Sequence, residues 1–496
     1  MNTDKKTVSS GDFLPTALWT KKAFAGEWTA VDGEAKDVIE PATGERLGVT
    51  VSGSSSDIAR SAKSAAEAQA AWAAEPADRR RGVLLEVARL LQQHREEIVG
   101  WIVRETGSIP GKGQTEVALT IGEALEAASL PMRATGIMLP AAGHGGRSMA
   151  ERVPLGVVGV ITPWNFPLIL AMRAVAPAIA LGNAVVLKPD LQTAVTGGVI
   201  MARLFELAGL PAGVLQMVPG GGEAGEALVT DPNVSMISFT GSTKVGRRVG
   251  ELAGGLLKRV QLELGGNNAF IVLDDADVDL ASSNGAWGSY LHQGQICMTA
   301  GRHLVHAKIA EAYVERLTER ASKLPVGNPA GGQVALGPLI SQKQIDRVER
   351  IVKSSVKAGA ELRTGGTHEG LFYKATVLAN VKPSMPAFEE EIFGPVAPVT
   401  VFRSDEEAIA LANSSPYGLS AAVQSKSISR ALDVARKLRS GMVHVNDQPV
   451  NVDAVAPFGG MGASGNGTRF GAMANLDEFT QWQWITVKDT ATAYPF

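Results

Sequence analysis

Several features that define whole classes of proteins are scarce in this chain of 496 residues. It contains one cysteine, Cys297, so no disulfide can form within the chain. Lysine plus arginine number 47 and aspartate plus glutamate 50, for a formal net charge of −3, and no long basic run occurs. A protein that binds nucleic acid or an anionic membrane through charge is therefore not expected.

Long apolar segments are also missing. No apolar run approaches the roughly 18 residues of a membrane span, and the start, MNTDKKTVSSGDF, lacks the apolar core of a signal peptide. We therefore expect a cytoplasmic protein that acts on a small neutral or weakly charged molecule. The length predicts two or three packed units, because a single core stops growing at roughly 250–300 residues.

Helical and strand-like patterns follow one another along the chain. Residues 55–74 and 78–106 have helical spacing, with Glu75-Pro76 between them. From residue 157, short strand-like runs such as VVGVIT, AVVLK and SMISF alternate with segments of helical spacing, and a similar alternation returns between 302 and 446. This pattern predicts an α/β fold with two Rossmann-like domains, each a parallel sheet covered by helices on both faces.

Two segments fit neither domain. Residues 137–154 resemble two extended pieces around a Gly-rich turn, and residues 479–488 combine alternating and adjacent apolar positions. Together they predict a small outlying sheet that covers another subunit's edge, with a surface hairpin and a tail as the alternative.

Two glycine-containing stretches are candidates for phosphate binding. Gly220, Gly222 and Gly225 satisfy GxGxxG, but the acidic residue expected about 20 positions later in a dinucleotide fingerprint is absent. Gly241 and Ser242 lead from a strand into a helix whose free N–H groups would face an anion, which makes them the better candidate. A structural turn and an ordinary helix cap stay open as alternatives.

Three polar residues could carry chemistry. Cys297 lies in the polar, glycine-containing stretch QGQICMTAG and is either a nucleophile or inert buried filler. Glu263 ends an apolar run before Gly265-Gly266, where it could act as a general base or be an exposed strand end. The side chain of Asn165, in TPWNFPL, could donate to an oxyanion or hold a turn.

Six motifs now show a resemblance. PWNFP (163–167), FTGS (239–242), LELGGNN (262–268), GQIC (294–297), EEIFGPV (390–396) and PFGGMGASGNG (457–467) occur in the order found in NAD(P)-dependent aldehyde dehydrogenases. The chain resembles that family over nearly its whole length, and HQGQICMTAGRHLVHA, LKPD and VHVNDQ look most like its bacterial benzaldehyde and vanillin dehydrogenases.

The resemblance implies oxidation of an aldehyde to the carboxylic acid. Cys297 would form a thiohemiacetal and then a thioester, Asn165 with the Cys297 N–H would hold the oxyanion, and Glu263 would activate the hydrolytic water. It implies no metal.

Two alternatives stay open: an aliphatic or semialdehyde dehydrogenase of the same family, and a catalytically silent structural or ligand-binding relative. Glu263 argues against a CoA-acylating dehydrogenase, which typically lacks this base.

The resemblance also implies the binding residues. For the cofactor they are Lys188, Gly241, Ser242, Glu391, Phe393, Trp164 and Gly222. Lining candidates for the substrate are Phe166, Leu170, Arg173, Ile296, Met298 and Phe458, which are mostly apolar and suit an aryl aldehyde. Arg173 would meet a ring substituent or form a structural ion pair.

Cofactor choice depends on one departure from the family. Many NAD-preferring relatives have a glutamate where this chain has Leu191, so the charge that repels a 2′-phosphate is missing. We expect NAD as the main cofactor, with NADP accepted.

The domain bounds follow the motifs. Residues 1–134 and 155–262 are expected to bind the dinucleotide, residues 263–465 to form the catalytic domain, and residues 135–154 and 466–496 to form an oligomerisation arm and C-terminal tail of a homodimer or homotetramer.

Overall fold

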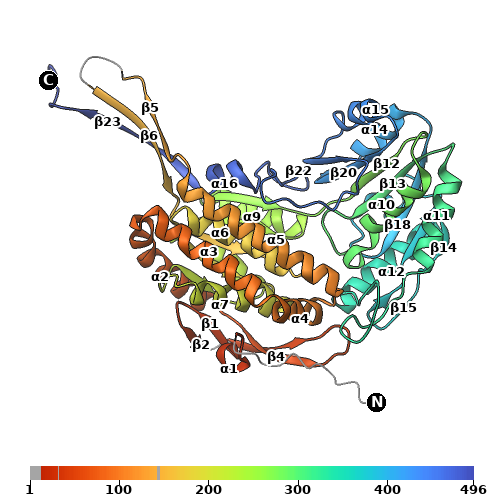
Figure 1. Ribbon diagram of the computed structural model, residues 1–496, viewed down its shortest axis with the longest axis horizontal. Helices are drawn as coiled ribbons and strands as arrows, with labels where there is room; N and C mark the ends of the chain where they lie inside the picture. Colours follow the sequence, from red (N-terminus) through yellow and green to blue (C-terminus); the bar gives the residue numbers. More distant parts are fainter. Residues whose placement is uncertain (1–12, 32, 142–145) are drawn as a thin grey trace.

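The chain folds into two seven-stranded sheets with helices on their faces and a three-stranded sheet that projects from the body (Figure 1). The computed structural model describes residues 13–31, 33–141 and 146–496. The expected α/β class with two parallel-sheet units is confirmed. The start of the sequence and the Gly-rich turn at 142–145 lie outside the described residues.

The first sheet is built from fully buried apolar runs such as VVGVI and AVVLK, which fit a parallel sheet covered on both faces. Its first five strands are parallel, and β1 pairs antiparallel with β9. In spatial order the strands are β11 (Arg259–Glu263), β10 (Val234–Thr240), β7 (Val157–Ile161), β8 (Ala184–Lys188), β9 (Leu215–Met217), β1 (Lys22–Phe24) and β2 (Trp28–Ala30).

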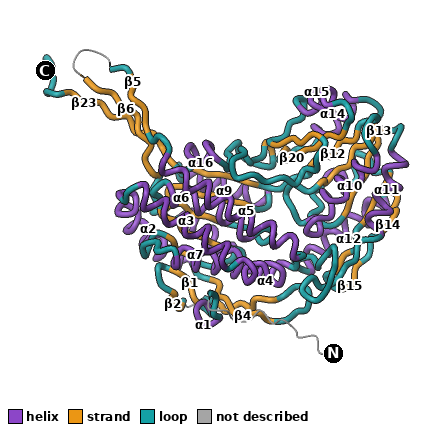
Figure 2. The backbone as a smooth tube through the Cα atoms, viewed as in Figure 1, coloured by secondary structure: helices purple, strands orange, loops and turns teal. Residues whose placement is uncertain are grey.

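Two separate apolar clusters pack helices against opposite faces of this sheet. Figure 2 shows the helices of this part of the molecule in purple. One face carries α2 (Ser55–Ala74), α8 (Gly222–Thr230) and α9 (Thr243–Gly255). The other carries α3 (Ala77–Gln93), α4 (Arg95–Thr106), α5 (Pro110–Ser129), α6 (Pro167–Ala180) and α7 (Ile200–Leu207).

The prediction of one helix over residues 78–106 is wrong in one respect, because the structure divides this segment into α3 and α4. His94 leaves helical geometry, at φ −102° and ψ 18°, and its ring stacks on Phe13 with the centroids 4.3 Å apart. The amphipathic pattern continues through the break, which is why periodicity alone does not reveal it.

The second sheet is parallel except for its edge strand β14. Its order is β14 (Glu361–Thr364), β17 (Thr376–Ala379), β18 (Val396–Phe402), β13 (Ala300–His306), β12 (Asn268–Val272), β20 (Ser420–Gln424) and β21 (Met442–Val445). Its helices are α10 (Val278–Tyr290), α11 (Ala310–Ser322), α12 (Gln342–Lys357), α14 (Asp405–Asn413) and α15 (Ile428–Ala435).

The outlying segments form the antiparallel sheet expected from their pattern, with β6 (Gly146–Pro154) between β5 (Gly136–Leu139) and β23 (Thr480–Lys488). It extends away from both larger sheets (Figure 1). Shorter elements are α1 (Thr16–Trp19), β3 (Glu34–Ile39), β4 (Arg46–Ser52), β15 (His368–Glu369), β16 (Phe372–Tyr373), α13 (Pro386–Glu389), β19 (Tyr417–Gly418), β22 (Met461–Gly462) and α16 (Ala472–Glu478).

The two large sheets are joined directly. Strand β11 ends at Glu263, and β12 of the other sheet begins five residues later at Asn268. Leu264 N donates to Ser464 O at 3.0 Å, which fixes the crossing segment against the C-terminal part of the chain. None of the helices in the described part of the chain has both the length and the apolar character needed to cross a membrane.

Candidate active site

Two cavities meet at Cys297. Cavity A has a volume of about 130 Å³ and cavity B about 260 Å³. Cys297, Asn165 and Leu170 line both, so the sulfur stands at their boundary. Cavity A is also lined by Pro163, Trp164, Thr240, Gly241, Ser242, Leu264, Gly265, Gln344, Arg347, Glu391 and Phe393. Cavity B is also lined by Thr115, Leu119, Phe166, Ile169, Arg173, Leu291, Ile296, Met298, Val450, Asn451, Val452 and Phe458.

The loop that carries Cys297 has an unusual backbone. His292, Gln293 and Gly294 all have positive φ, at 49°, 56° and 68°, so two non-glycine residues occupy the left-handed region. Gln293 Nε2 donates to Gly107 O at 3.0 Å and to Pro338 O at 2.9 Å. These buried hydrogen bonds hold the strained turn, and Cys297 follows it before β13 begins.

Asn268, where the crossing segment enters β12, supports the same loop. Asn268 Nδ2 donates to Cys297 O at 2.8 Å and to Thr299 O at 2.7 Å, and Asn268 Oδ1 accepts from Ser420 N at 2.9 Å. A Cβ on Gly266 would lie 2.3 Å from Cys297 O, so only glycine fits there.

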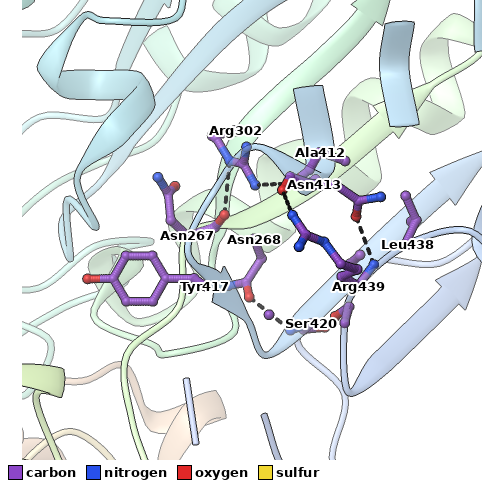
Figure 3. A pocket seen from close by; sticks show the side chains of 13 residues that line it. Asn267, Asn268, Arg302, Ala412, Asn413, Tyr417, Ser420, Leu438 and Arg439 are labelled. Atoms are coloured by element: carbon purple, nitrogen blue, oxygen red, sulfur yellow. Dashed lines mark hydrogen bonds between the residues drawn. The ribbon is translucent and has the colours of Figure 1, made fainter. Parts of the chain in front are cut away.

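A polar scaffold lies behind Asn268. Arg302 is buried and donates from Nε to Asn267 O at 3.0 Å and from Nη2 to Ala412 O at 2.9 Å (Figure 3). These bonds tie the beginning of β12 to β13 and to the end of α14. The crossing segment is therefore anchored on both of its sides.

Asn165 lies in the connection between β7 and α6, two residues before the helix begins. Its side chain is 5% exposed, and Nδ2 donates to Gln295 O on the cysteine loop at 3.0 Å. An amide nitrogen has two hydrogens, so one fixes the side chain and the second stays available toward the cavities.

Glu263 is buried at the end of β11, and its Oε1 has no hydrogen-bond partner. Burial raises the pKa of Glu263 to about 8, and the nearby charges of Arg173 and Arg469 and the N–H of Gly460 oppose that rise. Glu263 lines neither cavity, but its charge acts on the Cys297 thiol.

Cys297 itself is only partly exposed. Burial, followed by the negative charge of Glu263, raises the pKa of the Cys297 thiol to about 12, while Arg173 opposes the shift. At neutral pH the sulfur therefore rests as the thiol and must give up its proton when it attacks a carbon.

Cavity A has the chemistry expected of a nucleotide site. Ser242 caps α9 by accepting from Val245 N, and Gly241 and Ser242 line the cavity at this helix N-terminus, a position that favours an anion. Glu391 Oε1 accepts from Gly266 N at 2.9 Å, and Gln344 Oε1 is buried without a partner. Phe393 meets Trp164 edge to face at 5.5 Å between ring centroids. Unpaired acceptors, helix N–H groups and aromatic rings together fit a dinucleotide.

Two predicted cofactor residues lie outside both cavity linings. Lys188 is buried at the end of β8, and its Nζ donates to Gly220 O at 2.6 Å. Gly222 is exposed at the start of α8. The GxGxxG stretch is thus a turn between β9 and α8 that Lys188 holds in place.

Cavity B is mainly apolar, and the structure brings all six predicted lining residues to it. Arg173 is the exception in polarity. It is 2% exposed, its Cζ lies 4.2 Å from the Phe458 ring centroid, and its Nε lies 3.9 Å from Glu123 Oε1. Arg173 therefore makes the structural ion pair that the sequence left as one of two alternatives.

Sequence reasoning missed several lining residues. Thr115 and Leu119 are one helical turn apart on α5, and Gln344 and Arg347 are three residues apart on α12. An amphipathic pattern in residues 110–129 could have indicated α5, but not that one of its faces reaches the cysteine. Within the described residues, no group of three or more His, Cys, Asp or Glu side chains is arranged to hold a metal ion.

Comparisons with known proteins agree with this geometry. The Aldehyde dehydrogenase family matches residues 28–485. A vanillin dehydrogenase from Amycolatopsis sp. is 55% identical, over 98% of this chain and 100% of the relative. A benzaldehyde dehydrogenase [NAD(+)] from Pseudomonas putida is 50% identical, over 97% and 98%. The crystal structure of a salicylaldehyde dehydrogenase from Pseudomonas putida G7, complexed with salicylaldehyde, superimposes with a TM-score of 0.92 at 35% identity, over 96% and 99%.

Because Cys297 is the only cysteine, alkylation by iodoacetamide reports on the site directly. We expect the rate to rise about tenfold per pH unit between pH 7 and 10 without a plateau, since the thiol pKa lies near 12. Glu263→Gln should raise the rate severalfold above pH 8, where the native carboxylate is charged, because it removes a negative neighbour. Arg173→Met should lower the rate. A plateau below pH 9 would contradict this electrostatic picture.

Proposed function

Since the chain belongs to the aldehyde dehydrogenase family, we propose that it oxidises aromatic aldehydes to carboxylic acids and that Cys297, Asn165 and Glu263 carry the reaction. The observation that carries the proposal is the position of Cys297 at the boundary between cavity A, whose lining fits a dinucleotide, and the apolar cavity B. Within this proposal, residues 1–134 and 155–262 bind the dinucleotide, and residues 263–465 supply the nucleophile.

The first step forms a bond between Cys297 Sγ and the aldehyde carbon. The thiol proton passes to water as the bond forms, so the attacking group is the thiolate. The carbonyl oxygen becomes an oxyanion, which the free N–H of Asn165 Nδ2 and the Cys297 N–H would stabilise. Losing one such donor typically costs about 10²–10³ in rate.

When bound, NAD would supply the two-electron acceptor that oxidation of the Cys297 thiohemiacetal to a thioester requires. Gly241 and Ser242 would hold its pyrophosphate, and Glu391, Phe393 and Trp164 would hold its nicotinamide half. Lys188 and Gly222 would stand at the adenosine end. With Leu191 in place of a carboxylate, no negative charge at that position opposes a 2′-phosphate, so use of NADP stays part of the proposal.

Hydrolysis of the thioester completes the reaction. The Glu263 carboxylate takes a proton from water, the hydroxyl adds to the carbonyl carbon, and Cys297 leaves as the acid is released. With the pKa of Glu263 near 8, the base form makes up about a tenth of the molecules at pH 7 and grows as the pH rises.

The aromatic class is supported by cavity B. The rings of Phe166 and Phe458 and the side chains of Leu170, Ile296 and Met298 line it, so it offers a flat apolar substrate extensive contact. The relatives named for vanillin, benzaldehyde and salicylaldehyde point to the same class. The cytoplasmic location expected from the sequence stays a prediction.

The exposed apolar surface of the arm supports a homodimer or homotetramer. Ile137 and Met138 of β5 are 54% and 66% exposed, and Trp482 and Trp484 of β23 are 52% and 71% exposed. β5 and β23 are the two edge strands of the arm sheet, and edge strands that expose such residues are suited to pairing with a second copy of the chain.

Two variants separate the catalytic roles. Glu263→Gln should release about one equivalent of NADH per site in a rapid burst with benzaldehyde and then turn over at least 10²-fold more slowly, since the thioester forms but is not hydrolysed. Cys297→Ala should give no NADH while still binding NAD, as measured by fluorescence titration. Turnover by Cys297→Ala would exclude this mechanism, and a silent relative would give no NADH even in the native chain.

A substrate panel tests the aromatic assignment. Initial rates at 340 nm should give kcat/KM at least about tenfold higher for benzaldehyde and vanillin than for hexanal, because the planar ring fills cavity B. Cyclohexanecarbaldehyde is the matched control, similar in size but without an aromatic face. Each substrate is measured with NAD and with NADP, and NAD should be preferred. A tenfold advantage for the alkyl aldehydes would overturn the aromatic assignment.

Oligomeric state is tested by sedimentation. The native chain should sediment as a dimer or tetramer, and the double variant Ile137→Asp with Met138→Asp should shift to a smaller mass, because two charges are buried on assembly. Leu280→Asp is the control, since Leu280 is 64% exposed on α10, away from the arm. A monomeric native chain at micromolar concentration would contradict the proposal.

A further inference from the structure

Helix α5 carries a buried ion pair beside the active site. Lys112 and Glu116 are one turn apart, 2% and 0% exposed, and Lys112 Nζ pairs with Glu116 Oε2. A buried ion pair contributes little net stability, because an apolar pair of similar volume is often equally stable or more so. The role of this ion pair is therefore indicated by its contacts with other segments of the chain.

Lys112 reaches the backbone of Asn165. Its Nζ donates to Asn165 O at 3.0 Å and lies 4.2 Å from the centroid of the Phe166 ring. One ammonium thus fixes the peptide that joins Asn165 to Phe166.

Glu116 holds the other end of the same short segment. Its Oε1 accepts from Leu168 N at 2.9 Å and from Ile169 N at 3.4 Å, in the first turn of α6. Phe166, the residue before α6, makes no side-chain cap. A carboxylate from a neighbouring helix therefore satisfies the free N–H groups and the positive end of α6, which lies alongside α5 (Figure 1).

We propose that Lys112 and Glu116 are positioning residues that set the Asn165 side chain for oxyanion binding. This inference rests on the proposed function of Asn165. One N–H of Asn165 Nδ2 is bound to Gln295 O, so the direction of the second depends on where the Asn165 backbone lies. The ion pair fixes that backbone from both sides, by Lys112 at the Asn165 carbonyl and by Glu116 two and three residues after Phe166.

A double-mutant cycle tests the proposal. Lys112→Met should lower kcat/KM for benzaldehyde about 10–100-fold in the native background, as a misdirected donor loses much of the effect of an oxyanion-hole donor. In the Asn165→Ala background the same change should lower it less than about threefold, since the group that Lys112 positions is gone. Dissociation constants for NAD should stay within twofold.

A second variant guards against misfolding. Lys112→Met with Glu116→Gln leaves no unpaired buried charge and keeps an amide oxygen for the N–H groups of Leu168 and Ile169, so it should fold and still lose activity. Glu105→Gln is the matched control: Glu105 is equally buried, but it accepts from Val195 N at 2.9 Å and from Thr196 N at 2.7 Å, not from residues 165–169. It should keep kcat/KM within twofold.

The outcomes are distinct. An equal effect of Lys112→Met in both backgrounds, or full activity of the folded Lys112→Met, Glu116→Gln variant, would overturn the positioning role while leaving the proposed function intact. Full activity of Asn165→Ala alone would contradict the proposed role of Asn165 and remove the group that the pair is inferred to position.

Discussion

The site depends on the short crossing from β11 to β12, where the chain leaves one parallel sheet and enters the other. Glu263 ends the first sheet, and Asn268 begins the second and holds Cys297 O at 2.8 Å. Between them lie two glycines at which a side chain would collide with the site: a Cβ on Gly265 would lie 2.5 Å from Glu391 Oε2, and one on Gly266 would lie 2.3 Å from Cys297 O. The two glycines therefore allow acid, nucleophile and cavity wall to approach one another.

That close approach has an electrostatic consequence. Burial raises the pKa of Glu263 to about 8 and that of the Cys297 thiol to about 12, and each negative charge would further oppose the other. The nucleophile and the base are consequently both largely protonated at neutral pH. Charge develops during the reaction at a site where hydrogen-bond donors are already oriented, and such fixed donors stabilise it most.

The sequence predicted what is local and missed what depends on tertiary placement. Buried runs such as VVGVI and AVVLK were recognisable as strands, and Asn165, Glu263 and Cys297 stand at the ends of strands or in turns, where motifs are short and contiguous. The break at His94 interrupts a pattern that continues on both sides. Thr115, Leu119 and the Lys112–Glu116 pair belong to α5, whose approach to the site is set by its packing on α6 and could not be read from residues 110–129 alone.

Arg173 illustrates how one residue can belong to a cavity wall and to the chemistry. Its ion pair with Glu123, at 3.9 Å, leaves Nε and Nη1 without hydrogen bonds, so the pairing alone does not compensate a guanidinium that is 2% exposed. Its charge lowers the pKa of both Glu263 and Cys297, against the larger effect of burial. Without it, both groups would be still harder to ionise, whatever aldehyde occupies cavity B. The cost of burying Arg173 is therefore offset when the nucleophile and the base become charged.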